Sequence, residues 1–166
     1  MKKTLPAVFG MALLQGCTAL LPPNTPNDFV TTLSDSTFGN VYTAAPSIPY
    51  QDSVRNLKAN MDACVEGVIQ GPSIRSQSIV IGTGSGVWHY DITAASDNLT
   101  QFTLRRKVMG WTGPQHEGGN IVAVINVEPQ PESGASITGY SPWGSAWLME
   151  PIMAWGKGEN PGCPIG

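Results

Sequence analysis

The sequence has few of the side chains that carry charge or chemistry. Charged residues make up 13% of its 166 residues, and it contains two histidines and three cysteines. Its formal net charge of −3 excludes the basic surface that is typical of nucleic-acid-binding proteins. The histidines and cysteines never fall at metal-ligand spacing, so we expect neither a metal nor another cofactor.

The sequence also lacks an apolar run long enough to span a bilayer. The run from Leu5 to Leu14 has about ten residues, whereas a membrane-spanning helix needs about 20. It follows Lys2 and Lys3, and a basic start before a short apolar run is typical of a secretory signal peptide.

The residues that end this run, Leu-Leu-Gln-Gly-Cys at positions 13–17, resemble the lipobox of bacterial lipoproteins. The resemblance implies cleavage before Cys17, a diacylglyceryl group on its sulfur and acylation of its new amino group. An ordinary signal peptide followed by a chance cysteine is the alternative. We predict that residues 1–16 are the signal peptide and that Cys17 is the lipid anchor, which three acyl chains would make effectively permanent.

The residue after the cysteine indicates which membrane holds the anchor. In the enteric members of the class that this motif resembles, an aspartate there retains the protein in the inner membrane, whereas this chain has Thr18. We therefore expect a lipid-anchored protein in the inner leaflet of the outer membrane, with its domain facing the periplasm.

The other two cysteines are consistent with this compartment. Cys64 and Cys163 form an even pair, which predicts a disulfide in an oxidising periplasm. It would close a loop of about 100 residues, worth roughly 4–5 kcal/mol in the chain-entropy model. Two buried free thiols are the alternative.

Composition divides the mature chain into two parts. Residues 17–49 are rich in Pro, Thr, Ser and Asn and carry only Asp28 and Asp35 as charges, which predicts a flexible tether that reaches about 30 Å. A short strand around Val41–Thr43 is possible within it. Residues 50–166 are predicted to form a single domain.

The pattern of that domain predicts an α+β fold. Residues 50–68 place apolar side chains every three or four positions, as in a long amphipathic helix. Alternating patterns at 77–92, 99–109, 121–127 and 135–140 predict antiparallel strands, and 77–92 could be one bent strand or a hairpin. A short helix follows at 147–155, with Pro151 at its start or at a bend. We expect the long N-terminal helix and the short C-terminal helix to pack on one face of a four-stranded antiparallel sheet, with one disulfide.

Few residues suggest catalysis. The glycines at 82, 84 and 86 depart from the dinucleotide, P-loop and nucleophile-elbow motifs, and a glycine turn explains them better. His89 and Asp91 share one strand face, about 7 Å apart by strand rise, and could form a general acid–base pair. No nucleophile stands beside them in the sequence, so exposed strand positions are the simpler explanation. We predict that the protein is not an enzyme.

The basic run Arg105-Arg106-Lys107 lies within a predicted strand. The alternating pattern puts Arg105 and Lys107 on the solvent face, whereas Arg106 falls on the apolar face and needs a strand end or a buried partner.

The remaining candidate is an interaction loop. Residues 110–119 contain Trp111, His116 and Glu117 between two predicted strands, a pattern typical of an exposed binding loop. The layout of residues 50–164, with Ala-Trp-Gly at 154–156 and Gly-Cys-Pro at 162–164, is similar to that of small proteobacterial lipoproteins of unknown function. We therefore expect a non-catalytic binding or envelope-assembly module with an envelope protein as partner. An inhibitor or immunity protein against a wall-degrading enzyme, or a small hydrolase using His89 and Asp91, are the alternatives.

Overall fold

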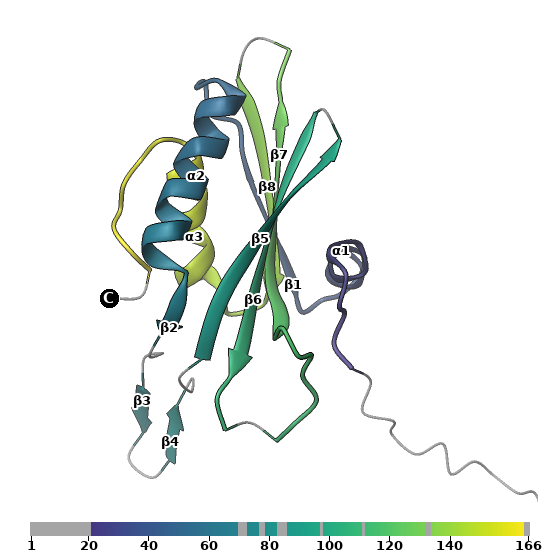
Figure 1. The fold of residues 1–166 in the computed structure, drawn as a ribbon, viewed down its shortest axis with the longest axis vertical. Coiled ribbons are helices and arrows are strands. Elements are labelled where there is room, and N and C mark those ends of the chain that lie inside the picture. Colours follow the sequence, from purple (N-terminus) through teal and green to yellow (C-terminus); the bar gives the residue numbers. More distant parts are fainter. Residues whose placement is uncertain are drawn as a thin grey trace, which may run out of the picture.

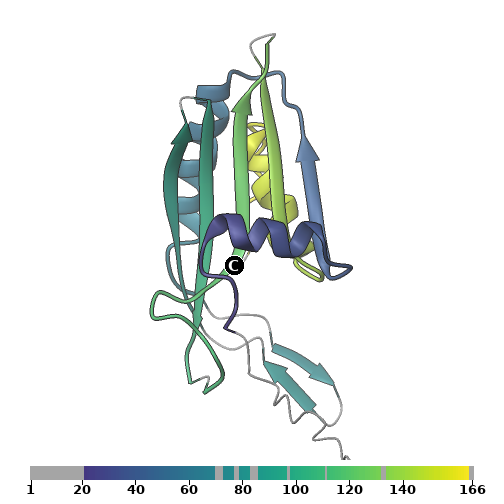
Figure 2. The same cartoon turned by 90° about the vertical axis from the view of Figure 1, so that its right-hand side faces the viewer.

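The computed structural model describes residues 21–69, 73–76, 79–82, 86–96, 98–110, 112–131 and 134–164. Its elements are α1 (Pro26–Ser34), β1 (Gly39–Ala44), α2 (Tyr50–Cys64), β2 (Gly67–Ile69), β3 (Ser73–Ser76), β4 (Ile79–Gly82), β5 (Gly86–Ser96), β6 (Leu99–Val108), β7 (Asn120–Pro129), β8 (Ala135–Pro142) and α3 (Ala146–Gly156). A six-stranded sheet has α2 and α3 on one face and α1 on the other (Figures 1 and 2). In the described ranges, no helix is long and apolar enough to cross a bilayer.

The sheet is antiparallel throughout, with the spatial order β1-β8-β7-β6-β5-β2. The predicted α+β class and antiparallel sheet are confirmed, but the prediction of four strands is wrong. Strands β5 to β8 form the centre, while β1 and β2 extend it at the two edges. β1 contains the short strand suggested around Val41–Thr43, whereas β2 has three residues, which is too short for an alternating pattern to predict it.

Residues 77–92 belong to two different sheets. β4 pairs with β3 in a separate two-stranded sheet, and β5 pairs with β6 in the main sheet. Neither one bent strand nor a simple hairpin therefore describes this segment. Residues 77–78 and 83–85 lie outside the described residues.

Helix α2 buries the apolar stripe that its sequence predicts. Leu57, Met61 and Val65 are buried in the main core between the helices and the sheet. The helix ends at Cys64 rather than at residue 68, because the chain turns at Gly67, whose φ of 112° suits glycine, and continues as β2.

Helix α3 packs on the same face of the sheet, as predicted. Met149, Ile152 and Trp155 are fully buried there. Pro151 lies inside the helix, where it removes one backbone donor. A Cβ at Gly139 would meet the end of the buried Met149 side chain, so glycine leaves room for that side chain between β8 and α3.

Helix α1 lies within the segment that composition predicts to be a tether. The Thr25 side chain caps it by accepting a hydrogen bond from the Asp28 N–H at 3.2 Å. Phe29 is only 4% exposed and packs with Ile121 and Val124 in a second, smaller core. Helix α1 packs against the sheet, and β1 pairs with β8 as its edge strand. The folded part therefore begins at Pro26, earlier than the predicted boundary at residue 50.

Polar contacts tie α2 to β5 at the surface. The Tyr90 hydroxyl donates a hydrogen bond to Asp62, and the Tyr90 N–H donates to Glu66 at 3.1 Å. Hydrogen bonds from Lys58 and Tyr90 lower the pKa of the Asp62 carboxyl, whereas burial and then the bond to Asp62 raise the pKa of the Tyr90 hydroxyl. Folding thus favours an ionised Asp62 and a neutral Tyr90, and both contributions are present between roughly pH 4 and pH 10.

The predicted disulfide between Cys64 and Cys163 is present in the structure. It joins the last residue of α2 to the tail beyond α3, across a sequence separation of 99 residues. The tail is otherwise exposed from Lys157 to Cys163, so the bond fixes a segment with few packing contacts of its own.

Removing this bond should lower the free energy of unfolding by about 3–5 kcal/mol, because the unfolded chain regains the entropy of a long open loop. Urea unfolding of the Cys64→Ala/Cys163→Ala variant against the parent protein measures the change. Gln51→Ala, at an exposed position of α2, is the control and should stay within about 0.5 kcal/mol of the parent. An unchanged midpoint in the double variant would show that the disulfide contributes nothing to stability.

Candidate functional site

The N-terminal segment meets the sheet at the end where β6 finishes and β7 begins, which we call the proximal end; it is drawn at the bottom of Figure 1. The register places the start of β5 beside the end of β6, and the start of β1 beside the end of β8, at this same end. The opposite, distal end carries the turn between β7 and β8 and the chain that leaves β1.

Arg105 is the centre of a polar cluster at the proximal end. Its guanidinium donates hydrogen bonds to the Asn24 carbonyl at 2.8 Å, the Asn24 side-chain oxygen at 3.1 Å and the Gly119 carbonyl at 3.3 Å. On the neighbouring strand, the Asp91 Oδ2 atom lies 3.6 Å from the Arg105 Nε atom. This one side chain therefore connects the N-terminal segment to β5, β6 and the loop before β7.

His116 makes a second contact to the N-terminal segment. Its Nε2 atom lies 2.7 Å from the Pro22 carbonyl oxygen, and because a carbonyl only accepts, the ring nitrogen is the donor. The His116 backbone N–H donates to the Asn120 side-chain oxygen at 3.1 Å, which fixes the position of the ring. Residues 22–24 are thus attached to the domain at two points.

The loop that carries His116 is itself held in place. The Gln115 side chain accepts a hydrogen bond from the Val108 N–H at 3.2 Å and donates to the Val108 carbonyl at 3.4 Å. Gly119 has a φ of 85°, and a Cβ at this position would lie 2.6 Å from the Arg106 backbone. Only glycine suits both demands, so this loop presents His116 in a defined position.

The candidate acid–base pair belongs to this cluster. The His89 Nε2 atom lies 4.0 Å from the Asp91 Oδ2 atom, on one face of β5 as the sequence predicts. Asp91, whose side chain is 59% exposed, also faces Arg105. Asp91 therefore lies between His89 and the arginine that holds residue 24, and this arrangement gives the Asp91 carboxylate a structural role.

The structure describes only some of the predicted interaction residues. His116 contacts Pro22, and Glu117 is exposed beside it. Trp111 and the predicted anchor Cys17 lie outside the described residues. The candidate interaction loop thus stays a prediction, and one of its three side chains is engaged within the chain.

Sequence reasoning missed the role of Arg105. The alternating pattern of β6 predicts that the Arg105 side chain faces solvent. Its partner Asn24 lies 81 positions away in the sequence, and no local signal connects the two residues. Arg106 lies on the apolar face as predicted, with its guanidinium carbon 5.3 Å from the centre of the Trp88 ring. Burial there lowers the Arg106 pKa.

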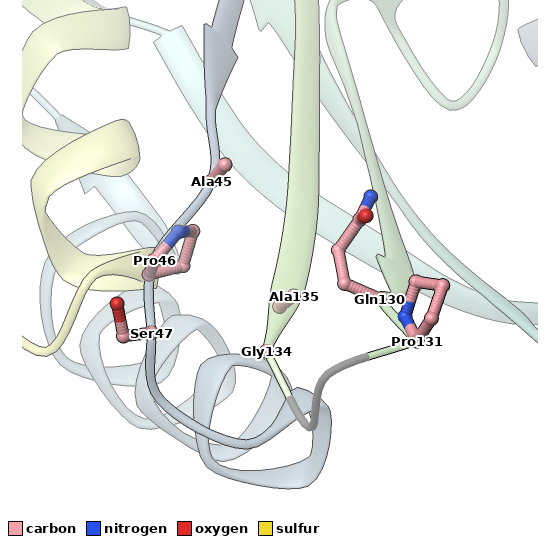
Figure 3. A pocket seen from close by; sticks show the side chains of 7 residues that line it. All are labelled: Ala45, Pro46, Ser47, Gln130, Pro131, Gly134 and Ala135. Atoms are coloured by element: carbon pink, nitrogen blue, oxygen red, sulfur yellow. The ribbon is translucent and has the colours of Figure 1, made fainter.

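A surface hollow of about 410 Å³ lies at the distal end (Figure 3). The Pro46 carbonyl accepts a hydrogen bond from the Ala135 N–H at 3.2 Å, which joins its two walls. A Cβ on Gly134 would lie 2.9 Å from the same carbonyl oxygen, so glycine keeps these walls close. The seven residues that line it are Ala45, Pro46, Ser47, Gln130, Pro131, Gly134 and Ala135.

Neither metal ligands nor related proteins guide the choice of function. Over the described ranges, no group of three or more His, Cys, Asp or Glu side chains is arranged to hold a metal ion. No protein-family model matches the sequence, and no curated protein matches it either.

Replacing Arg105 should release the N-terminal segment. Arg105→Ala removes the bonds to Asn24, and because hydrogen bonds to charged groups contribute about 1.5–3 kcal/mol, amide exchange in residues 21–34 should become at least about tenfold faster. Hydrogen-exchange mass spectrometry measures this change. Lys107→Ala, an exposed position on the same strand, should leave the exchange rate unchanged. Equal protection in both variants would mean that α1 and the His116 contact hold the segment without Arg105.

Proposed function

We propose that this protein is a lipid-anchored protein of the bacterial outer membrane whose domain faces the periplasm and binds another envelope protein. The observation that carries the proposal is the attachment of residues 22–24 to Arg105 and His116, five positions after the cysteine of the lipobox-like motif. Residues 22–24 lie close to the proposed anchor in the sequence and are bound firmly to the domain, which suits a domain that is held at a membrane.

The link between the proposed anchor at Cys17 and the attached Pro22 is short. Five residues reach at most about 17 Å when fully extended. A tether of residues 17–49 would reach about 30 Å on average as a coil. An anchor at Cys17 would therefore keep the domain close to the bilayer and restrict its rotation.

The disulfide supports an oxidising compartment. Stable structural disulfides occur mainly in secreted and periplasmic proteins, because cytosolic reductants keep thiols reduced. The bond between Cys64 and Cys163 uses both cysteines that the lipobox-like motif leaves over.

The distal hollow is the binding surface that we favour. A domain anchored through its proximal end presents its distal end to the periplasm. The hollow is lined by two proline rings, small side chains and the Gln130 amide, and its volume is within the usual range of ligand sites. Such a surface suits a short protein segment, whose backbone could bond to the amide.

A non-catalytic role accounts for the polar cluster. Asp91 balances the charge of Arg105, and His89 extends the cluster along β5. Asp91 thus favours the arginine conformation that holds Asn24. One of the two side chains that the hydrolase alternative needs contributes in this way to attachment of the N-terminal segment.

The anchor has a direct test. Cys17→Ala should abolish labelling by radioactive palmitate and release the protein from the membrane fraction, because no other acylation site follows from the motif. Cys64→Ala/Cys163→Ala is the matched control and should still be labelled. Labelling that persists without Cys17 would refute the proposed anchor.

The binding surface has a separate test. Gln130→Arg places a bulky charge at the hollow and should lower recovery of cross-linked envelope partners by about tenfold, the effect of losing roughly 1.4 kcal/mol of binding. Glu117→Arg, on the exposed loop at the proximal end, should not change recovery. If only Glu117→Arg loses the partner, the contact belongs to the loop, and the hollow is not the binding surface.

A further inference from the structure

Exposed apolar side chains gather at the proximal end of the domain. The two most exposed are Trp143, at 76%, and Phe38, at 74%. The Trp143 backbone N–H donates a hydrogen bond to the Phe38 backbone carbonyl at 2.7 Å, so the two residues lie side by side where β8 ends and β1 begins. Adjoining exposed aromatic side chains are typical of surfaces that contact another protein or a membrane.

Other exposed apolar residues extend this surface. Val87 lies at the start of β5, Met109 follows the end of β6, and Trp147 lies in the first turn of α3. Leu21, 61% exposed, directly precedes the attached Pro22. Of the eight exposed large hydrophobic residues recorded in the described ranges, only Val41 and Ile92 lie elsewhere.

We propose that this proximal surface lies in the headgroup region of the bilayer that holds the anchor. The proposal rests on the proposed lipidation of Cys17. The surface consists of Leu21, Phe38, Val87, Met109, Trp143 and Trp147.

The length and direction of the chain support a bilayer as the occupant. The described chain begins at Leu21 on this very surface, and four positions separate that residue from Cys17. Four extended residues reach about 14 Å. The end of the domain that carries the exposed apolar residues is therefore the end that the link holds nearest the lipid.

The chemistry of the side chains also suits a membrane interface. Tryptophan is enriched at the headgroup level, where its ring contacts apolar atoms and its N–H contacts water or lipid. Phenylalanine, methionine and leucine add apolar area. Lys107, exposed near the end of β6, can contact lipid phosphate.

This contact would orient the domain as well as hold it. The surface spans the ends of β1, β5, β6 and β8. At this same end, β3, β4 and the loop between β6 and β7 extend beyond the strand ends, so they would enter the headgroup region together with the surface (Figure 1). The hollow at the distal end would then point into the periplasm.

The test uses the acylated full chain in phosphatidylethanolamine–phosphatidylglycerol vesicles that contain lipids with brominated acyl chains. Bromine quenches tryptophan emission at short range, so the quenched fraction should fall in Trp143→Phe, which keeps the apolar surface but removes the reporter. In Trp155→Phe, which removes a fully buried tryptophan, the quenched fraction should rise. An unchanged quenched fraction in Trp143→Phe would overturn the proposal.

A second measurement uses lysine reactivity and needs no tryptophan. In vesicles, Lys107 should react with a water-soluble amine reagent severalfold more slowly than in detergent, whereas Lys157, at the far end of α3, should react equally in both. Phe38→Ser/Trp143→Ser should remove the protection of Lys107. The matched control Val41→Ser/Ile92→Ser changes two exposed apolar residues outside the surface and should keep it.

The outcomes separate this inference from the proposed function. A parent protein that is not labelled by palmitate would refute the anchor itself. Acylated protein with no quenching through Trp143 would keep the anchor and refute the bilayer contact. Protection of Lys107 in native envelopes but not in pure lipid vesicles would assign the surface to a protein partner and also overturn the proposal.

Discussion

Burial of α2 and α3 against one face of the sheet is the interaction on which the fold depends. Leu57 and Met61 from α2 and Met149, Ile152 and Trp155 from α3 are fully buried in one core with side chains of β6, β7 and β8. Burying a large apolar side chain contributes about 1.5–3 kcal/mol, so this layer outweighs any single polar contact. The disulfide adds a covalent link at the edge of the same layer.

The second face of the sheet serves a different purpose. A small core around Phe29 holds α1 there, and the polar cluster around Arg105 lies beside it. One face therefore supplies most of the stability, while the other positions the N-terminal segment. His89 and Asp91, the residues with catalytic potential, lie in β5, and the Asp91 carboxylate faces the Arg105 side chain that positions this segment.

The sequence predicts those features whose signals are local. The stripe of α2, strands β6, β7 and β8 and the short last helix follow from periodicity, and the disulfide follows from the number of cysteines. The strand predicted at 77–92 instead covers β4 and only part of β5. Helix α1 does not, because a proline- and threonine-rich segment can still fold when one phenylalanine is buried by residues almost 100 positions away. The attachment of Asn24 is equally non-local, since Arg105 looks like any exposed strand arginine until the chain is folded.

Strand β1 lies at the edge of the sheet, and residues 36–50 around it contain no charged side chain. Uncharged edge strands are open to pairing with a second copy, which is a common route to aggregation. Antiparallel pairing of two β1 strands would point the proximal ends of the two copies in opposite directions. Two copies held at one flat bilayer by the proposed anchor could not both adopt that arrangement, so the proposed attachment would also protect the protein from self-assembly through this edge.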